Sequence, residues 1–231
     1  MTQLAMSPTG FQPEEPLPRP AFTNRTPEST LKDEEWKHRS PYTMQTEAEL
    51  GPIKWRGKCL CGKVTYALKR EKPLNAKYCH CRGCQVAHGA PLQWAVIFHK
   101  SDMSFINGSS GLVFYSSTHQ SQEYGLPTKV YCDNCRTPIM DEGRNVCLIF
   151  PQLMELEGSS DEQRQKREPL KPTYVSAMVH CVGFTDSSCS CHIFYETRMT
   201  DIPDGLPKWR GMENASDRLD DQGNHIDSLS R

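Results

Sequence analysis

One run of six residues constrains this chain more than any other feature. It reads Cys79-His80-Cys81-Arg82-Gly83-Cys84 and places three thiols in a C-x-C-x2-C pattern. Zinc accepts soft thiolate ligands at about 2.3 Å, and Gly83 lets the backbone turn, so the three sulfurs can reach one metal ion. If the segment is extended, His80 points to the opposite face from Cys79 and Cys81, and we do not expect it to be a ligand.

Two further cysteine pairs flank this run. Cys59 and Cys61 lie upstream in Cys59-Leu60-Cys61, and Cys132 and Cys135 lie downstream in Cys132-Asp133-Asn134-Cys135. Four sulfurs saturate zinc in a structural site, whereas three protein ligands with an exchangeable position form a catalytic one. The count therefore predicts two zinc ions per chain, one structural and one catalytic. The residues alone leave open a pair of disulfides with cysteines left over, or one zinc with three spare thiols.

The compartment bears on that choice. The chain contains no apolar run of about 18 residues, and it begins with polar, proline-bearing sequence in place of a signal peptide. We expect a cytoplasmic protein, with the nucleus as the alternative, and no membrane partner. In a reducing compartment, eleven cysteines at such spacings favour zinc over disulfides. The formal net charge of −1 gives no basic field, so nucleic acid is not the expected partner.

Four cysteines lie outside the three groups. They are Cys147, Cys181, Cys189 and Cys191. Cys189-Ser190-Cys191 has ligand-like spacing and could form a third metal site with Cys181. The favoured interpretation is that these thiols are small buried apolar groups, because free cysteines commonly behave so.

The composition predicts one folded domain between two tails. Hydrophobic residues make up 36% of the chain, below the usual share of about 45%. Residues 1–52 are rich in proline and poor in branched apolar residues, so we expect a disordered arm with a solvated Trp36. The domain is expected over residues 53–211, with an exposed charged insertion at 155–172, and residues 212–231 form a polar tail.

The apolar pattern predicts a mainly β fold of short antiparallel strands. Val64, Tyr66 and Leu68 alternate with other residues, as expected of a half-buried strand. Similar runs are separated by turn residues such as Asn107-Gly108. Strands are expected at residues 64–68, 92–98, 103–106, 112–115, 146–150, 174–182 and 192–195.

Three segments in this order carry a family resemblance. They are Gly57-Lys58-Cys59-Leu60-Cys61-Gly62, Cys79-His80-Cys81-Arg82-Gly83-Cys84-Gln85 with Gly89-Ala90-Pro91, and Tyr131-Cys132-Asp133-Asn134-Cys135 with Pro138. This arrangement closely resembles the glutathione-dependent formaldehyde-activating enzyme and centromere protein V family, over roughly residues 53–210. The resemblance implies a β-tent-like zinc fold and, in at least some members, carbon–sulfur lyase activity. It also implies that the structural ion is held by Cys59, Cys61, Cys132 and Cys135, and the second ion by Cys79, Cys81 and Cys84.

The resemblance also implies a function. The expected protein is a zinc-dependent, carbon–sulfur lyase-like enzyme that forms or cleaves a small-thiol adduct, of the glutathione type, of an aldehyde or related metabolite. The competing interpretation is a non-catalytic zinc-binding interaction module, associated with chromatin, because the family includes a chromosome-associated protein.

Two residues near the central cysteines are candidates for catalysis. His88 could transfer a proton, since the unperturbed pKa of histidine, about 6.5, suits neutral pH. Arg82 could bind a substrate carboxylate or offset the negative charge of a trithiolate zinc. The alternatives without a catalytic role are that His88 is a polar residue at the rim of the site and that Arg82 is a solvated surface residue.

The chain departs from the family pattern in features that bear on the substrate. Arg136 stands where a glycine usually follows the second cysteine of the pair, and His88 stands where small residues are common. The insertion at 155–172 and the long N-terminal arm are additions.

Overall fold

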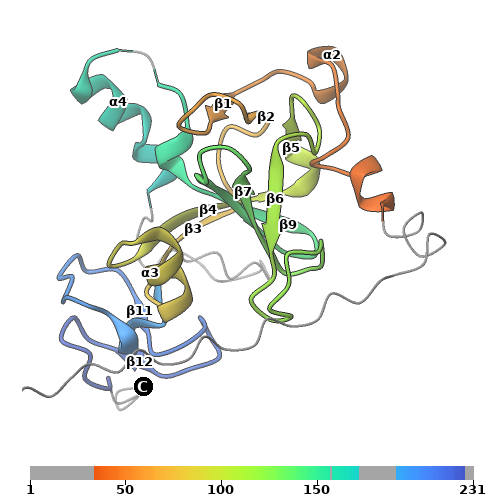
Figure 1. Ribbon diagram of the computed structural model, residues 1–231. Coiled ribbons are helices and arrows are strands. Elements are labelled where there is room, and N and C mark those ends of the chain that lie inside the picture. Colours follow the sequence, from red (N-terminus) through yellow and green to blue (C-terminus); the bar gives the residue numbers. More distant parts are fainter. Residues whose placement is uncertain (1–33, 157, 172–190, 227–231) are drawn as a thin grey trace, which may run out of the picture. The chain divides into compact units, whose positions relative to one another are not determined.

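The computed structural model describes residues 34–156, 158–171 and 191–226 (Figure 1). Apart from Glu34 they belong to one compact unit, Glu35–Arg231. The fold is mainly β, as the sequence predicts. The strands are β1 (Trp55–Lys58), β2 (Thr65–Leu68), β3 (Asn75–Cys79), β4 (Gln93–His99), β5 (Met103–Phe105), β6 (Leu112–Tyr115), β7 (Thr128–Cys132), β8 (Pro138–Glu142), β9 (Val146–Ile149), β10 (Cys191–Ile193), β11 (Lys208–Trp209) and β12 (Arg218–Leu219).

The helices are short. The α-helices are α2 (Glu47–Leu50), α3 (Arg82–His88) and α4 (Ser160–Lys166), and the 3-10 helices are η1 (Glu35–His38), η2 (Lys100–Asp102), η3 (Pro151–Leu153), η4 (Glu168–Leu170) and η5 (Tyr195–Thr197). No helix in the described ranges is long and apolar enough to cross a membrane.

The described strands form two sheets. The small sheet has the order β1-β2-β5, and the large sheet has the order β12-β11-β10-β3-β4-β9-β8-β7-β6. Most neighbours are antiparallel, but β10 is parallel to both β3 and β11, which corrects the expectation of antiparallel strands alone. Only a tight hairpin forces an antiparallel pair, and β10 reaches β3 after more than a hundred residues.

The large sheet has two different faces. Val96, Ile149, Met140 and Val130 are cross-strand partners on one face and are almost fully buried. We call this the core face. Gln93 precedes Val96 by three positions on β4, so its side chain and that of its β3 partner Cys79 lie on the opposite face, here called the site face.

The core lies between the core face and the small sheet. Tyr66, Leu68 and Phe105 of the small sheet pack in one cluster with Val96 and Phe98 of the large sheet. Burying such apolar surface stabilises a fold by roughly 25 cal/mol per Å². In Figure 1, α2 and the small sheet lie at one end of the compact unit, and α3 lies near β11 and β12 at the other.

Residues 35–52 are part of the fold, which corrects the expectation of a disordered arm for this stretch. Trp36 stacks on Tyr124 with ring centroids 4.1 Å apart, and Tyr42 is only 2% exposed. The Tyr42 hydroxyl donates a 2.5 Å hydrogen bond to Glu142 on β8. The prediction rested on the average composition of residues 1–52. The average did not show that Trp36 and Tyr42 pack against the domain and anchor residues 35–52. Residues 1–33 lie outside the described ranges.

The C-terminal segment also differs from the expected polar tail. Leu219 on β12 is 3% exposed, and Lys208 on β11 is paired with Asp221 at 2.7 Å. The predicted tail therefore supplies a strand and a counter-ion as far as residue 226. Residues 227–231 lie outside the described ranges.

Most of the predicted strands are present, but α3 was not predicted. β2, β4, β5, β6, β9 and β10 overlap their predicted ranges. The strand expected at 174–182 lies outside the described residues. α3 has seven residues, with Cys81 as its N-cap and Gly89 in the left-handed region, at φ 57°, as its C-cap. Seven residues are too few to show a clear helical period of apolar residues. The cysteines at the start of α3 are placed as metal ligands, so their spacing does not follow that period either.

The predicted insertion is exposed along α4, where no residue is buried. Beyond α4, Leu170 is fully buried, and its carbonyl oxygen accepts a 3.1 Å hydrogen bond from the Trp94 indole. The insertion is therefore exposed over α4 and anchored to the core at its end.

Candidate metal and substrate sites

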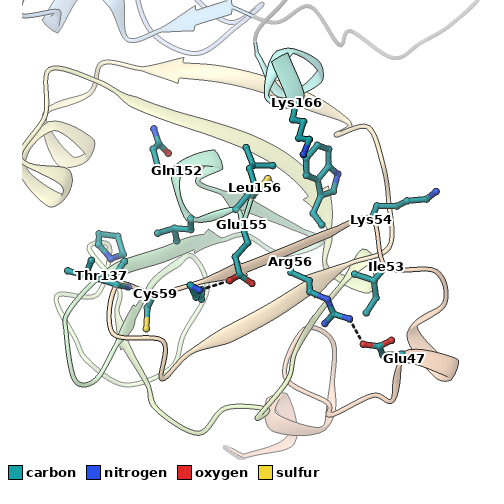
Figure 2. A pocket seen from close by; sticks show the side chains of 16 residues that line it. Glu47, Ile53, Lys54, Arg56, Cys59, Thr137, Gln152, Glu155, Leu156 and Lys166 are labelled. Atoms are coloured by element: carbon teal, nitrogen blue, oxygen red, sulfur yellow. Dashed lines mark hydrogen bonds and ion pairs between the residues drawn. The ribbon is translucent and has the colours of Figure 1, made fainter. Parts of the chain in front are cut away.

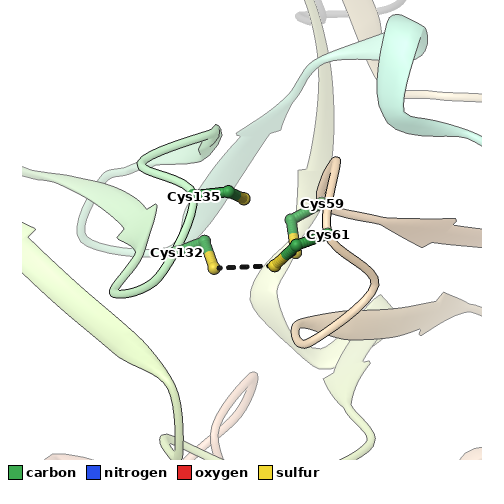
Figure 3. A group of neighbouring side chains, drawn as sticks. All are labelled: Cys59, Cys61, Cys132 and Cys135. Atoms are coloured by element: carbon green, nitrogen blue, oxygen red, sulfur yellow. Dashed lines mark hydrogen bonds between the residues drawn. The ribbon is translucent and has the colours of Figure 1, made fainter.

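The structure brings four cysteines into one group at the junction of the two sheets (Figure 3). Cys59 and Cys61 lie in the turn between β1 and β2. Cys132 is the last residue of β7, and Cys135 lies in the turn between β7 and β8. We call this group the tetrathiolate cluster. Because its two pairs come from different sheets, an ion held there would join the sheets.

The sulfur positions of the tetrathiolate cluster fit tetrahedral zinc. The Sγ atoms lie within 4.8 Å of one another, with 3.5 Å between Cys59 and Cys61 and 3.8 Å between Cys61 and Cys132. Zinc–sulfur bonds of about 2.3 Å place the sulfurs of a tetrahedron about 3.8 Å apart. The four cysteines can therefore hold a metal ion without a change of backbone path.

The turn that carries Cys135 has an unusual backbone. Arg136 adopts φ 59°, in the left-handed region that glycine adopts at least cost. Its amide donates to the carbonyl oxygen of Cys132 at 3.1 Å. Arg136 therefore keeps this turn at some cost in strain, at a position whose backbone geometry suits glycine. Thr137 hydrogen-bonds the Cys135 thiol and lowers its pKa to about 5.

The second group, the trithiolate cluster, comes from one short segment. Cys79 ends β3, Cys81 is the N-cap of α3, and Cys84 lies in the first turn of that helix. Their Sγ atoms lie within 4.8 Å of one another. The Cys81 sulfur accepts the backbone N–H of Cys84 at 3.4 Å. Hydrogen bonds from the Cys79 and Cys84 thiols lower the pKa of Cys81, so negative charge is favoured at this sulfur.

His80 is turned away from the trithiolate cluster. It is 1% exposed, and its Nε2 lies 2.8 Å from Nδ1 of His192. His192 in turn lies 2.8 Å from Asp204, whose carboxylate also binds Lys208 at 2.9 Å. Burial, followed by the effect of His192, lowers the pKa of His80 to about 4. The predicted orientation of His80 is confirmed, and its role here is to join β3 to β10.

The site face carries a polar chain that the sequence analysis missed. Lys129 on β7 is paired with Asp141 on β8 at 2.8 Å, and Asp141 accepts a 3.0 Å hydrogen bond from Gln93 on β4. Lys129 is close enough to lower the pKa of Cys81 electrostatically. Burial by itself would lower the pKa of Lys129, but the Asp141 carboxylate raises it overall. Lys129 therefore supplies positive charge beside the thiolates.

The two residues predicted to act in catalysis lie on α3. Arg82 is exposed in the first turn, directly after Cys81. His88 is the last residue of the helix and is half-buried, with its ring edge-on to Phe150 at 4.6 Å. Burial lowers the pKa of His88. Both lie within a few residues of the thiolates, on opposite ends of the helix.

His88 and Gln93 line a small cavity on this side of the molecule. Its volume is about 250 Å³, and Trp94, Pro138 and Leu153 form other parts of its wall. A groove of about 1270 Å³ shares Thr137, Pro138, Gln152 and Leu153 with it. Figure 2 shows that Arg56 and Glu155 in this groove are engaged in ion pairs, Arg56 with Glu47 and Glu155 with Lys58. The cavity and the groove therefore lie next to each other.

The remaining cysteines give a mixed outcome. Cys147 is fully buried in the core, as expected of a small apolar group, and its thiol donates a weak hydrogen bond to the Phe98 carbonyl oxygen at 3.7 Å. Burial raises its pKa. Cys191 is buried with its sulfur 3.5 Å from Nζ of Lys77. Cys181 and Cys189 lie outside the described residues, so a third metal site stays a prediction.

These features define a class of protein: a mainly β chain with two cysteine groups that could each hold a metal ion. The profile of the glutathione-dependent formaldehyde-activating enzyme family matches residues 54–177, more than half of the chain. The chain belongs to this family. The matched range contains all seven cysteines of the two clusters.

Two further comparisons add little. No curated protein matches the chain significantly. A crystal structure of a Rhodobacter sphaeroides protein, a structural-genomics target, is 19% identical and covers 46% of this chain and 93% of its own, with a TM-score of 0.36.

Proposed function

We propose that this protein is a zinc-dependent enzyme of the carbon–sulfur lyase type. It forms or cleaves the adduct between a small thiol of the glutathione type and formaldehyde or a related aldehyde. The observation that carries the proposal is the trithiolate cluster at the start of α3, a helix whose last residue, His88, lines a small cavity. The chain belongs to the glutathione-dependent formaldehyde-activating family.

The two clusters have different roles in this proposal. Cys59, Cys61, Cys132 and Cys135 would hold a structural zinc with all four positions filled by the chain. Cys79, Cys81 and Cys84 would hold the second zinc and leave one position for a substrate thiol. When bound there, zinc keeps a thiol ionised at neutral pH.

The surrounding side chains orient the substrate and handle its charge. Arg82 is exposed beside Cys81 and is available to bind a substrate carboxylate through two parallel hydrogen bonds. Lys129 offsets the net negative charge of three thiolates around a divalent ion. Both cations favour an anionic thiol such as glutathione over a neutral one.

The reaction needs one proton transfer. Addition of a thiol to formaldehyde forms a carbon–sulfur bond, and the proton released by the thiol ends on the former carbonyl oxygen as a hydroxyl group. The reverse reaction breaks the bond and returns the proton. His88 lies at the cavity with a lowered pKa, so it is mostly neutral at pH 7 and can accept a proton.

The test is exchange of formaldehyde with glutathione, measured by NMR on the zinc-loaded protein against an enzyme-free control, because the adduct also forms unaided. We expect Cys81→Ser to lower the catalysed rate at least 100-fold. Cys147→Ala is the matched control, because this thiol lies in the core away from both clusters, and it should leave the rate within about threefold. Full turnover by Cys81→Ser would refute the proposal and leave the non-catalytic module as the better interpretation.

A further inference from the structure

A further cavity lies beside β6, the last strand of the large sheet, and we call it the edge cavity. Its volume is about 340 Å³, within the range of about 300–1,000 Å³ that is usual for small-molecule sites. It shares no lining residue with the cavity beside His88 or with the groove. Its wall combines apolar, aromatic and hydrogen-bonding residues: Val113, Phe114, Tyr115, Gln122, Tyr131 and Arg136.

The edge cavity lies on the site face of the large sheet. Val130 of β7 is on the core face, so the alternation of side chains along the strand puts its neighbours Lys129 and Tyr131 on the site face. Tyr115 of β6 is the direct partner of Lys129 and shares that face. Cys84 acts electrostatically on both Lys129 and Tyr131. The edge cavity and the trithiolate cluster therefore lie on the same side of the sheet.

Hydrogen-bond donors dominate the polar part of this wall. The Arg136 guanidinium offers several N–H donors and no acceptor, and the hydroxyl groups of Tyr115 and Tyr131 can each donate. No carboxylate in the described ranges lines the edge cavity, and Asp141, which acts electrostatically on Tyr131, is paired with Lys129. Within the described part of the chain, the side chains of Arg136, Tyr115 and Tyr131 form no hydrogen bond or ion pair. These donors are therefore available to an anionic ligand.

The backbone of Arg136 also points to a role for its side chain. Its φ of 59° lies in the left-handed region, which glycine adopts at the least cost. The arginine side chain is exposed, and it forms no bond within the described residues that would offset the strain. Such strained conformations gather at ligand and active sites, where the residue is kept for its function. At Arg136, the cationic group beside the edge cavity supplies such a function.

A guanidinium and two phenols suit a carboxylate on a flat group. The guanidinium fork can bind both carboxylate oxygens through parallel hydrogen bonds, and a tyrosine hydroxyl can donate another. The tyrosine rings and Val113 offer apolar surface to the rest of the ligand. We propose that the edge cavity binds a carboxylate carried by a small planar group, with Arg136 as the anchor and Tyr131 as the second donor.

Two sources can supply this carboxylate. One is a free aromatic or other planar carboxylate. The other is the glutathione-type thiol of the proposed function, because glutathione has two carboxylates, Arg82 can hold only one of them, and the trithiolate cluster lies on the same face. The carboxylate chemistry is common to both sources. The edge-cavity site itself does not depend on the proposed enzyme activity.

The experiment uses benzoate as the probe and benzamide as its neutral counterpart of the same shape. Binding to the zinc-loaded full-length protein is measured by ligand-observed NMR. We expect benzoate to bind with a Kd of about 1 mM or lower, and benzamide to bind at least about 10-fold more weakly. Arg136→Gly should weaken benzoate binding at least about 10-fold, while benzamide binding changes by less than about threefold.

The variants separate binding from folding. Arg136→Gly should not lower Tm or zinc content, because glycine suits the positive φ at this position. Arg144→Gly removes an exposed arginine outside the edge cavity and should leave the benzoate affinity within about threefold of the wild type. Tyr131→Phe keeps the ring and removes the hydroxyl group, so it should weaken benzoate binding about 3–10-fold.

Kinetics with glutathione and formaldehyde distinguish the two sources. If Arg136→Gly raises KM for glutathione about 10-fold and benzoate competes with glutathione, the substrate supplies the carboxylate. If KM is unchanged and benzoate does not compete, the edge cavity takes a free carboxylate. Either result agrees with a carboxylate site at Arg136.

The remaining outcomes separate this inference from the proposed function. If the wild-type protein does not bind benzoate, or if Arg136→Gly binds it equally well, the edge-cavity site is overturned. The proposed function then stands, because it rests on the trithiolate cluster. Benzoate binding that depends on Arg136, in a protein that exchanges no formaldehyde, would overturn the proposed function alone.

Discussion

The two cysteine clusters differ in how the chain builds them. The tetrathiolate cluster takes its pairs from turns more than seventy positions apart, one in each sheet. The trithiolate cluster comes from six consecutive residues at the end of β3 and the start of α3. A metal ion in the tetrathiolate cluster would close a long loop of the chain and join the two sheets. An ion in the trithiolate cluster would link only residues that are already neighbours in the chain. A metal ion should therefore stabilise the fold mainly at the first cluster.

The clusters also differ in their surroundings. The tetrathiolate cluster adjoins the core through Cys59 and Cys132, which are at most 1% exposed. Near the trithiolate cluster, Arg82 directly follows Cys81, Lys129 acts electrostatically on Cys81 and is paired with Asp141, and His88 lines a small cavity at the other end of α3. Charged and titratable groups gathered at a cavity are typical of a site where chemistry occurs. The proposed division into a structural and a functional cluster is consistent with this contrast.

The largest expected effect is the difference between Cys132→Ser and Cys84→Ser. Losing a structural zinc ligand removes much of the metal's contribution to folding, so Cys132→Ser should lower Tm by more than about 15 °C or prevent folding. Cys84→Ser should lose the metal of the trithiolate cluster and lower Tm by only a few degrees. Metal content and thermal unfolding measure both. Equal losses of Tm in the two variants would contradict the division of roles.

Removing the Arg82 side chain tests charge recognition at the trithiolate cluster. Losing a charge-assisted bond to a carboxylate should raise KM for glutathione about 10-fold, with kcat within about threefold. Arg144→Ala, at an exposed arginine between β8 and β9, is the control and should change neither value. With 2-mercaptoethanol, which has no carboxylate, Arg82→Ala should behave as the wild type. An equal effect on both thiols would remove Arg82 from substrate recognition.

Acid should destabilise the protein through the two buried histidines beside the trithiolate cluster. The pKa of His80 is lowered to about 4, and burial also lowers that of His192. Unfolded histidines titrate near about 6.5, so between pH 6.5 and 4 the unfolded state binds more protons and the folded state loses stability as the pH falls. Urea unfolding at pH 7 and pH 5 measures this loss.

His192→Gln provides the comparison for acid sensitivity. Glutamine at this position can keep a hydrogen bond to Asp204 without titrating in this range. The variant should lose less stability between pH 7 and pH 5 than the wild type. Because metal release by acid affects both proteins alike, the difference between them reports on the histidine. An identical pH dependence would show that His192 does not contribute.

The smallest expected effect is at the turn of the tetrathiolate cluster. Arg136→Gly relieves a positive φ and should stabilise the protein by about 0.5–1 kcal/mol. Arg144→Gly, at a position without a positive φ, should instead destabilise it by a similar amount. Chemical denaturation measures both changes. A loss of stability in Arg136→Gly would mean that the arginine side chain makes a contribution larger than the strain.

Local sequence patterns were sufficient to predict the fold class, and together with the family resemblance they predicted the seven cysteines that the structure gathers into two groups. Spacings such as C-x-C-x2-C limit which thiols can approach one another, and a period of two in apolar residues indicates strands, because both depend on backbone geometry over a few residues. The same period placed His80 opposite Cys79, as the structure has it. The division into four and three cysteines followed from the count.

Tertiary structure alone decided which polar groups surround the thiolates and where the fold ends. Lys129 and Asp141 are partners across the short turn between β7 and β8, but Gln93 meets them only through the pairing of β4 with β9. No local pattern encodes a register between two strands that are joined by so long a connection. Trp36 enters the fold for a similar reason, since it stacks on Tyr124, which is far away in the chain. Leu219 is buried on β12, the strand that pairs with β11. The sequence determined which thiols within one run or one pair can share a metal ion, because that spacing is local. The pairing of distant strands brought the two pairs of the tetrathiolate cluster together. It also determined what surrounds the thiols.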